Sequence, residues 1–167
     1  GETSMHTYDE QGVYYVSLKV SDGETDSLPS IVTVYVGVEQ GASMPPMPFE
    51  LMEGWNLISL PLQPQNTSVD YAFSSIQGKY EAIWTYDTTA GEWLRYIVNG
   101  PVSLNSLNEV KSGVGYWIKM SQPGMLIAQG GQPEVAIMLA VGWNLVGFNS
   151  QKARPVEECM ASIAGCY

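Results

Sequence analysis

Hydrophobic and polar residues alternate along two stretches near the start of the chain. Residues 13–20 read Val-Tyr-Tyr-Val-Ser-Leu-Lys-Val, so Val16, Leu18 and Val20 fall on one face of an extended segment. Residues 31–38 form a second run rich in β-branched side chains. Ser-Asp-Gly at 21–23 has the composition of a turn. The pattern predicts an antiparallel hairpin, which must pack on another element because two strands alone are marginally stable in water.

A seven-residue motif occurs twice in the chain, at residues 54–60 and 142–148. The copies read Gly-Trp-Asn-Leu-Ile-Ser-Leu and Gly-Trp-Asn-Leu-Val-Gly-Phe, and they lie 88 positions apart (142 − 54 = 88). We interpret them as equivalent strands of a structural repeat. The residues that define the repeat are Trp55 and Asn56 in the first copy and Trp143 and Asn144 in the second. We expect both indoles to fill the core, because apolar strand residues surround them.

Each copy is followed by a short amphipathic stretch that ends at a glycine. In the first stretch Val69, Phe73 and Ile76 recur at the spacing of one helical face. The second stretch repeats this face with Val156, Met160 and Ile163. The predicted helix ends are marked by Thr67 or Ser68 as the first N-cap, Pro155 in the first turn of the second helix, and Gly78 and Gly165 at the C-termini. Each unit therefore predicts strand, loop, short helix and strand.

Further strands are predicted between the two copies. Residues 82–86 and 92–97 flank an Asp-Thr-Thr-Ala-Gly turn and indicate a hairpin. Residues 114–120 and 125–128 indicate another hairpin across Ser-Gln-Pro-Gly. Residues 135–139 are apolar and lead into the second motif as a last strand candidate. The predicted fold class is mostly β, between all-β and α+β, with short helices.

A proline-rich stretch divides the chain. Residues 41–50 hold three prolines in four positions, which favours an extended linker and excludes a helix. We therefore expect one domain at residues 1–40 and a second at 51–167. The second comprises a first repeat copy at 51–141 and a truncated second copy at 142–167.

The first 40 residues contain three motifs, His-Thr-Tyr at 6–8, Gly-Val-Tyr at 12–14 and Val-Ser-Leu-Lys-Val-Ser-Asp at 16–22. In this order they resemble the second half of a PKD (polycystic kidney disease) type domain. The resemblance implies strands of an immunoglobulin-like β-sandwich. The Trp-Asp-Phe-Gly-Asp-Gly stretch typical of the family is absent, so we expect the sequence to begin inside a larger protein, with open sheet edges in its first domain.

Residues 50–167 contain four motif segments, at 54–61, 83–87, 113–118 and 142–147. In this order they resemble repeat modules of bacterial and archaeal surface proteins. The resemblance implies a secreted or cell-surface location and a modular organisation, without a defined chemistry. In such modules the second copy commonly continues with its own tryptophan-rich hairpin, whereas this sequence stops at Tyr167. We interpret this as truncation or as completion by another subunit.

The composition agrees with an extracellular β module. Hydrophobic residues make up 45% of the chain and aromatic residues 11%, whereas charged residues make up only 14%. The net charge is −10, from 17 acidic and 7 basic residues. Such a field repels phosphate backbones, so we expect no nucleic-acid partner. No apolar run approaches the roughly 18 residues that a spanning helix needs, so we expect no membrane insertion.

The residue types needed for catalysis do not converge on a recognisable motif. The single histidine, His6, belongs to the PKD-like strand signature, where a structural role explains it. No phosphate loop, nucleophile elbow or His-Glu-x-x-His motif occurs. The candidate carboxylate pairs have ordinary positions before a strand, around a turn or at a helix start: Glu50 and Glu53, Asp87 and Glu92, Glu157 and Glu158. We expect a protein that is not an enzyme and has no cofactor.

Weaker candidates remain for ion binding and covalent modification. Asp22, Glu24 and Asp26 alternate in a loop and form a weak calcium candidate, with solvated turn carboxylates as the ordinary interpretation. Cys159 and Cys166 are either two reduced thiols or the ends of a small disulfide-closed loop. Asn-Thr-Ser at 66–68 satisfies the glycosylation sequon, which often arises by chance.

Two functions follow from these observations. The leading hypothesis is a non-catalytic module for adhesion, spacing or filament assembly with other subunits or surface proteins, in which strand complementation joins neighbours. The alternative is a carbohydrate-binding accessory domain of a secreted hydrolase, with a polysaccharide on a ligand face formed by Trp93 and Tyr96. Trp93 is the preferred residue for such a face.

Overall fold

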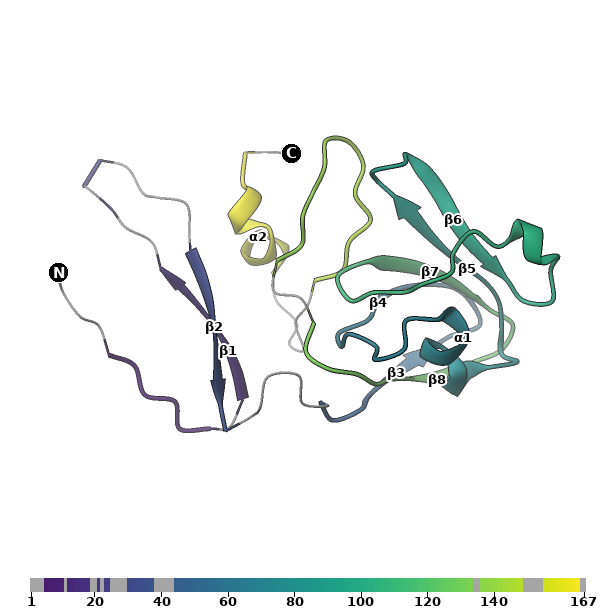
Figure 1. Ribbon diagram of the computed structural model, residues 1–167, viewed down its shortest axis with the longest axis horizontal. Coiled ribbons are helices and arrows are strands. Elements are labelled where there is room, and N and C mark those ends of the chain that lie inside the picture. The colour runs from purple at the N-terminus through teal and green to yellow at the C-terminus, as the bar shows by residue number, and fades with distance from the viewer. Residues whose placement is uncertain are drawn as a thin grey trace. The chain divides into compact units, whose positions relative to one another are not determined.

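The computed structural model describes residues 5–10, 12–18, 21, 23–24, 30–37, 44–133, 136–148 and 155–165. The chain divides into two compact units, one formed by residues 1–42 and 153–167 and the other by residues 43–152. Strands dominate and the helices are short, so the mostly-β fold class is confirmed (Figure 1). No helix in the described parts of the chain is long and apolar enough to span a membrane.

The first unit contains the predicted hairpin. β1 (Gly12–Leu18) and β2 (Ser30–Val36) pair antiparallel, with Gly12 opposite Val36 and Leu18 opposite Ser30. Three aromatic rings pack in series before and within β1. The ring centroids of His6 and Tyr8 are 4.6 Å apart, and those of Tyr8 and Tyr14 are 4.2 Å apart. The Tyr14 hydroxyl donates a hydrogen bond to the Glu10 carbonyl at 2.8 Å. His6 therefore takes part in ring packing beside a strand.

The same unit ends in a short helical segment, α2 (Val156–Cys159) followed by the 3₁₀ turn η3 (Ala161–Ile163). Pro155 occupies the N-cap position of α2, one residue before the first turn in which the sequence placed it. Gly165 has φ +84°, the left-handed conformation predicted for the end of this helix.

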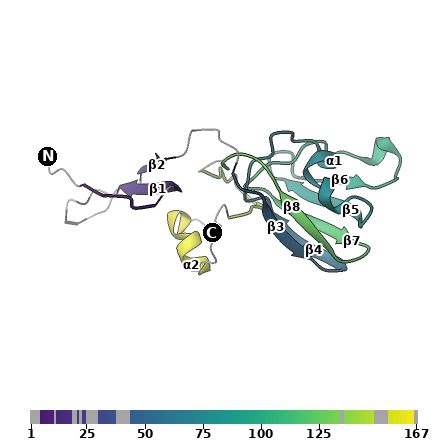
Figure 2. The ribbon, with the colours of Figure 1, turned by 90° about the horizontal axis from the view of Figure 1, so that it is seen from below.

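The second unit is built from two antiparallel sheets and a short helix (Figures 1 and 2). The four-stranded sheet has the order β4-β7-β5-β6, and β3 pairs with β8 in a two-stranded sheet. The elements of this unit are β3 (Met47–Leu51), β4 (Gly54–Ser59), α1 (Val69–Ala72), η1 (Ser74–Ile76), β5 (Tyr80–Asp87), β6 (Glu92–Ile97), η2 (Val102–Leu104), β7 (Gly115–Met120) and β8 (Gly124–Ala128).

Two predictions about these strands are wrong. β7 and β8 follow each other but do not form a hairpin, because β7 pairs with β4 and β5 while β8 pairs with β3. The predicted linker at 41–50 also overlaps β3, which begins at Met47. Pro48 is tolerated there because β3 has a partner on one side only, so a residue without an N–H does not break the ladder. The β5–β6 hairpin is confirmed.

One apolar cluster holds the second unit together. It collects the inner face of the four-stranded sheet, both strands of the two-stranded sheet and the helix α1–η1, through Leu51, Leu60, Val69, Phe73, Ile76, Tyr80, Ile83, Leu107, Val110, Tyr116, Ile118, Met120, Leu126 and Ala128. Val69, Phe73 and Ile76 are buried as the helical spacing predicted. Gly78 ends the segment with φ +76°.

The start of α1 differs from the expected cap. Ser68 occupies the N-cap position, but its side chain makes no capping hydrogen bond. Instead the Asn66 side chain accepts the Ser68 N–H at 3.0 Å, which closes a local turn one step earlier. Asn66 is therefore exposed and engaged in this turn.

Three tyrosines of this unit have raised pKa values, each about 12 against an ordinary 10.0. Burial is the main cause for Tyr80 and Tyr116. For Tyr96 the main cause is the hydrogen bond that its hydroxyl donates to Asp70, at 2.6 Å. The folded state thus holds these protons more tightly than the unfolded chain does.

We therefore expect the unit to lose stability in alkaline solution. A folded pKa above the unfolded value of about 10 contributes stability that is complete below pH 10 and is lost between pH 10 and 12. Urea unfolding should give a smaller free energy of unfolding at pH 11 than at pH 9. Tyr116→Phe should flatten this decrease, and an equal decrease in the variant and the parent would contradict the assignment.

Candidate binding surface

The two faces of the four-stranded sheet differ in what lies against them. Directly opposed residues on neighbouring strands point to the same side of a sheet. Ile58, Tyr116 and Ile83 point to the side of the apolar cluster, and the last two are almost completely buried. Thr85, also on this side, donates its hydroxyl hydrogen to the Gly115 carbonyl at 2.8 Å. The inner face is therefore fully used by the core.

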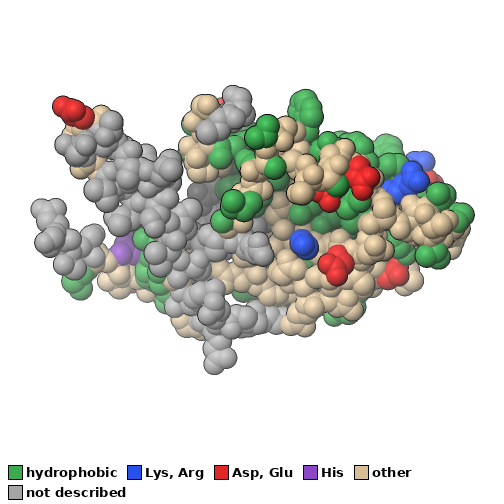
Figure 3. All heavy atoms as spheres, turned by 45° about the horizontal axis from the view of Figure 1, so that its top comes forward, with side chains coloured by type: hydrophobic (Ala, Val, Ile, Leu, Met, Phe, Trp, Pro, Cys, Tyr) green, Lys and Arg blue, Asp and Glu red, His purple; other side chains and the backbone are tan. Residues whose placement is uncertain are grey.

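The other side, which we call the aromatic face, carries four of the five tryptophans. In one row Leu57 lies opposite Trp117, which lies opposite Trp84, which lies opposite Arg95. Beside this row Trp55 pairs with Lys119, and Tyr86 pairs with Trp93. We define the aromatic face by Trp55, Leu57, Trp84, Tyr86, Trp93 and Trp117. Hydrophobic side chains gather over the surface of this unit in Figure 3.

The rings of the aromatic face meet edge to face. Trp55 and Trp117 have centroids 6.5 Å apart and planes at 86°, while Tyr86 and Trp93 have centroids 5.4 Å apart and planes at 63°. The Arg95 guanidinium lies over the Trp84 ring, 5.7 Å from its centroid. Trp55 is 54% exposed and Trp93 50% exposed. These two indoles are thus the accessible ones, on the outer strands β4 and β6.

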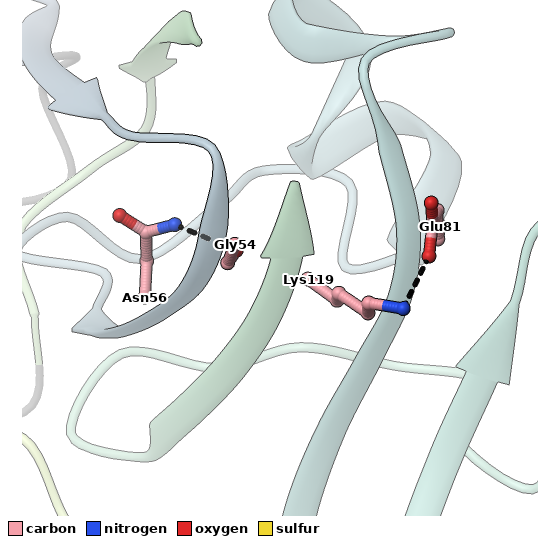
Figure 4. A network of polar contacts seen from close by, with 4 residues as sticks. All are labelled: Gly54, Asn56, Glu81 and Lys119. Atoms are coloured by element: carbon pink, nitrogen blue, oxygen red, sulfur yellow. Dashed lines mark hydrogen bonds and ion pairs between the residues drawn. The ribbon is translucent and has the colours of Figure 1, made fainter. Parts of the chain in front are cut away.

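Charged groups on and beside this face are already engaged. The Lys119 ammonium lies 2.7 Å from a Glu81 carboxylate oxygen, with both side chains about half exposed (Figure 4). Arg95 donates its Nε hydrogen to the Leu104 carbonyl at 2.9 Å, in addition to its contact with Trp84. The face therefore combines accessible indoles with polar groups held in fixed positions.

The expectation that Trp55 and Trp143 fill the core is wrong. Trp55 points outward because its neighbour Ile58 lies on the inner side and side chains alternate along β4. Trp143 is 86% exposed. Apolar neighbours in sequence did not distinguish the buried side of the strand from the open one.

The two copies of the motif nevertheless have the same turn conformation and the same hydrogen bonds. The Asn56 side chain closes a turn: its Oδ1 accepts the Met52 N–H at 3.0 Å, and its Nδ2 donates to the Met52 carbonyl at 2.7 Å. Its Nδ2 also donates to the Gly54 carbonyl at 3.2 Å (Figure 4). Gly54 has φ +94°, which suits glycine. The Gly-Trp-Asn motif thus forms a turn that is held by its own asparagine hydrogen bonds, with the indole pointing outward.

Asn144 makes the same three hydrogen bonds in the second copy. Its Oδ1 accepts the Ala140 N–H at 3.0 Å, and its Nδ2 donates to the carbonyls of Ala140 at 2.8 Å and Gly142 at 2.9 Å. Gly142 has φ +103°. The helices repeat as well, since Phe73 at φ −106° and Met160 at φ −97° end the two α segments alike.

Burial does not repeat between the copies. Leu51 is 2% exposed and its counterpart Leu139 is 39% exposed; Leu60 is 1% exposed and Phe148 49%; Val69 is 2% exposed and Val156 72%. The predicted strand at 135–139 is also wrong, because residues 136–139 belong to no strand. The second copy therefore has the local conformations of the first without its packing.

Residues 142–148, which we call the clasp, close over one end of the aromatic side of the sheet. Gly115 donates to the Leu145 carbonyl at 3.1 Å, and Gly147 donates to the Gly113 carbonyl at 3.0 Å. A Cβ on Gly115 would lie 2.9 Å from Leu145 Cγ, and a Cβ on Gly147 would collide with the Ser59 side chain. The close approach at these two positions depends on the absence of a side chain on Gly115 and on Gly147.

The other ligand-face residue, Tyr96, does not join Trp93. Tyr96 lies opposite Ile83 and packs against the core, so the two side chains leave β6 on opposite faces. The prediction of a shared face is therefore wrong for Tyr96. The sequence contained the signal, since positions 93 and 96 have opposite parity along a strand. Trp55, Trp84, Tyr86 and Trp117 join Trp93 instead, and only the strand register brings them together.

The remaining candidates are scattered. Glu24 is exposed, and Asp22 and Asp26 lie outside the described residues, as does Cys166. Cys159 is a half-buried free thiol. Among the residues that the structure describes, no three His, Cys, Asp or Glu side chains gather as metal ligands. Asp87 accepts the N–H groups of Thr89 and Ala90 in the β5–β6 turn, which is a structural use of its carboxylate.

A groove of about 240 Å³ lies between the helix α1–η1 and β8. Tyr71 is the one ionisable side chain in its lining, which otherwise consists of Leu60, Leu62, Pro64, Ala72, Ser74, Ser75, Ile127, Ala128 and Gln129. This lining brings no pair of ionisable groups together. The aromatic face is therefore the stronger candidate for binding.

Replacing the two repeated asparagines should have unequal effects. Asn56→Ala removes three hydrogen bonds from a turn that joins two core strands, and we expect a loss of about 1–2 kcal/mol in the free energy of unfolding. Asn144→Ala removes the same bonds from a turn outside the core, and we expect a change below about 0.5 kcal/mol. Chemical denaturation of both variants checks this, and equal losses would refute it.

A single added methyl group, on Gly147, should detach the clasp from the sheet. Gly147→Ala forces a Cβ into Ser59, so the hydrogen bond from Gly115 to Leu145 should open. Hydrogen exchange at the Gly115 amide should accelerate about tenfold or more, while the β5–β6 amides keep their protection. Val146→Ala is the matched control, because position 146 is exposed and already carries a Cβ. Unchanged exchange at Gly115 in Gly147→Ala would show that the clasp is not held there.

Comparison with known proteins adds no relative. No protein-family model matches the chain, and neither a curated protein nor a solved structure does. The resemblances to PKD-type domains and to surface-protein repeat modules therefore remain predictions. The case for a function accordingly comes from the residues and contacts described above.

Proposed function

We propose that this chain is a non-catalytic module of a secreted or cell-surface protein, and that it assembles with other subunits by strand complementation. One observation carries the proposal. The second repeat copy adopts the turn and helix geometry of the first, yet side chains that are core in the first copy stay exposed in the second. A partner that buries them would restore the packing of the first copy.

The first copy indicates what kind of partner is needed. Leu51 is buried where β3 pairs with β8, and residues 136–139 are the counterparts of part of β3. These residues pair with no strand in the described chain. An extended backbone is the element that saturates such a segment, because it supplies both hydrogen bonds and alternating side chains. Burying each large apolar side chain would add about 1.5–3 kcal/mol to the association.

The first unit supports the same proposal independently. Within the described residues β1 and β2 pair only with each other, so the hairpin has two unpaired edges. The hydrogen bond from Tyr14 to the Glu10 carbonyl has the form of the tyrosine corner found in immunoglobulin-like sandwiches, which supports the PKD-like interpretation. A hairpin of such a sandwich needs further strands, from the same protein or from a neighbour.

A proline in the exposed segment tests strand complementation. Successive N–H groups of a strand point to opposite edges, so one of positions 138 and 139 must donate to an added strand. We expect either Met138→Pro or Leu139→Pro to abolish concentration-dependent association in light scattering, because proline has no N–H. Met138→Ala and Leu139→Ala are the matched controls, since they keep the N–H.

The outcome can contradict the proposal in two ways. A parent chain that stays monomeric at high concentration, and that captures no strand from a partner subunit, would argue against complementation. Association that survives both proline variants would place the contact elsewhere. Near-ultraviolet circular dichroism of the five tryptophans checks that each variant keeps its fold.

A further inference from the structure

The aromatic face exposes more apolar surface than folding requires. The core lies on the other side of the sheet, so Trp55, Trp84, Trp93 and Trp117 contribute little to it. Contiguous exposed apolar surface in a folded domain marks a site of interaction. This surface is distinct from residues 136–139.

The clasp shows how a polypeptide reaches this side of the sheet, and why the rest of the face suits a different ligand. The clasp backbone approaches at residues 113–115, where Gly115 bonds to Leu145, Gly147 bonds to Gly113 and a bridge joins Val114 to Val146. Across the remaining face the positions are filled by tryptophan, tyrosine, leucine, isoleucine, alanine, lysine and arginine. A ligand there must lie on the rings instead of pairing with the backbone.

The charges of the face favour a neutral ligand. Lys119 is paired with Glu81, and Arg95 is engaged with Trp84 and the Leu104 carbonyl. Both cations of this face therefore already have partners within the protein, which leaves neither unpaired for an anionic ligand. The chain as a whole carries a charge of −10, which repels polyanions. The paired side chains still offer hydrogen-bond donors and acceptors to hydroxyl groups.

The accessible indoles define a path across the sheet. Trp93 lies on β6 and Trp55 on β4, which are the two edge strands. Adjacent strands are about 4.8 Å apart, so these edges are separated by roughly 14 Å. Trp84 and Trp117 lie between them on β5 and β7. An extended ligand with several flat apolar faces would contact Trp93 and Trp55 at its two ends, while the Arg95 guanidinium lies over Trp84 between them.

We propose that the aromatic face binds a neutral polysaccharide. The C–H faces of its pyranose rings pack on Trp93 and Trp55, and its hydroxyl groups bond to the Lys119–Glu81 pair and to Arg95. This site does not depend on strand complementation, because it uses none of residues 136–139. The polysaccharide would hold the module against a glycan surface while subunits join elsewhere.

Binding to insoluble cellulose, chitin, xylan and mannan, each measured by depletion from solution, tests the proposal. We expect the parent chain to bind at least one of them, and Trp93→Ala and Trp55→Ala to weaken that binding about tenfold each. Tyr71→Ala is the matched control, because Tyr71 is 48% exposed but lies on α1, which packs against the core side of the sheet. Thermal unfolding confirms that each variant is folded.

Three results would overturn the polysaccharide site. The first is no binding to any of the four polysaccharides, and the second is an equal loss of binding in Tyr71→Ala. The third is loss of protein self-association in Trp93→Ala, which would identify the face as a protein interface. The proline variant that abolishes association, Met138→Pro or Leu139→Pro, separates this site from strand complementation. It should keep polysaccharide binding, whereas Trp93→Ala should keep subunit association.

Discussion

The apolar cluster around β7 is the contact on which the second unit depends. β7 lies between β4 and β5, and it sends Tyr116, Ile118 and Met120 into the core. Because side chains alternate, Trp117 and Lys119 must then point to the other side of the sheet. The same constraint sets the neighbouring strands, whose outward residues follow from their register with β7. The aromatic face is therefore a consequence of how the core is filled.

The two Gly-Trp-Asn turns separate local from tertiary interactions. Each asparagine makes three hydrogen bonds within its own five-residue turn, and these bonds form in both copies. The turn conformation therefore does not depend on the core. Burial does, because it requires strands from distant parts of the chain, and only the first copy has them. An element can thus have its native shape and still lack its native partner.

Two surfaces of this protein carry apolar groups that its own fold leaves exposed, and they differ in chemistry. Residues 136–139 and their neighbours offer aliphatic side chains and free backbone, which suit another strand. The aromatic face offers rings with engaged polar groups between them, which suit a flat, uncharged ligand. Gly115 and Gly147 lie where the clasp contacts the sheet, and a side chain at either position would crowd Leu145 or Ser59.

The sequence by itself determined the features that depend on near neighbours. Alternation predicted the β1–β2 and β5–β6 hairpins, and helical spacing predicted that Val69, Phe73 and Ile76 share a buried face. The repeat was visible as a motif, and its turns and helices proved equivalent in conformation. In each case the information lies within a few residues, where backbone preferences and side-chain periodicity act directly.

Only the tertiary structure decided which face of each strand is inside and which strands meet. Alternation shows that Trp55 and Ile58 lie on opposite sides, but burial on one side depends on what packs there. The pairing of β8 with β3 joins residues far apart in sequence, so no local pattern distinguishes it from a β7–β8 hairpin. The aromatic face assembles from four strands through that same long-range register, which is why the sequence pointed to Trp93 and missed its neighbours.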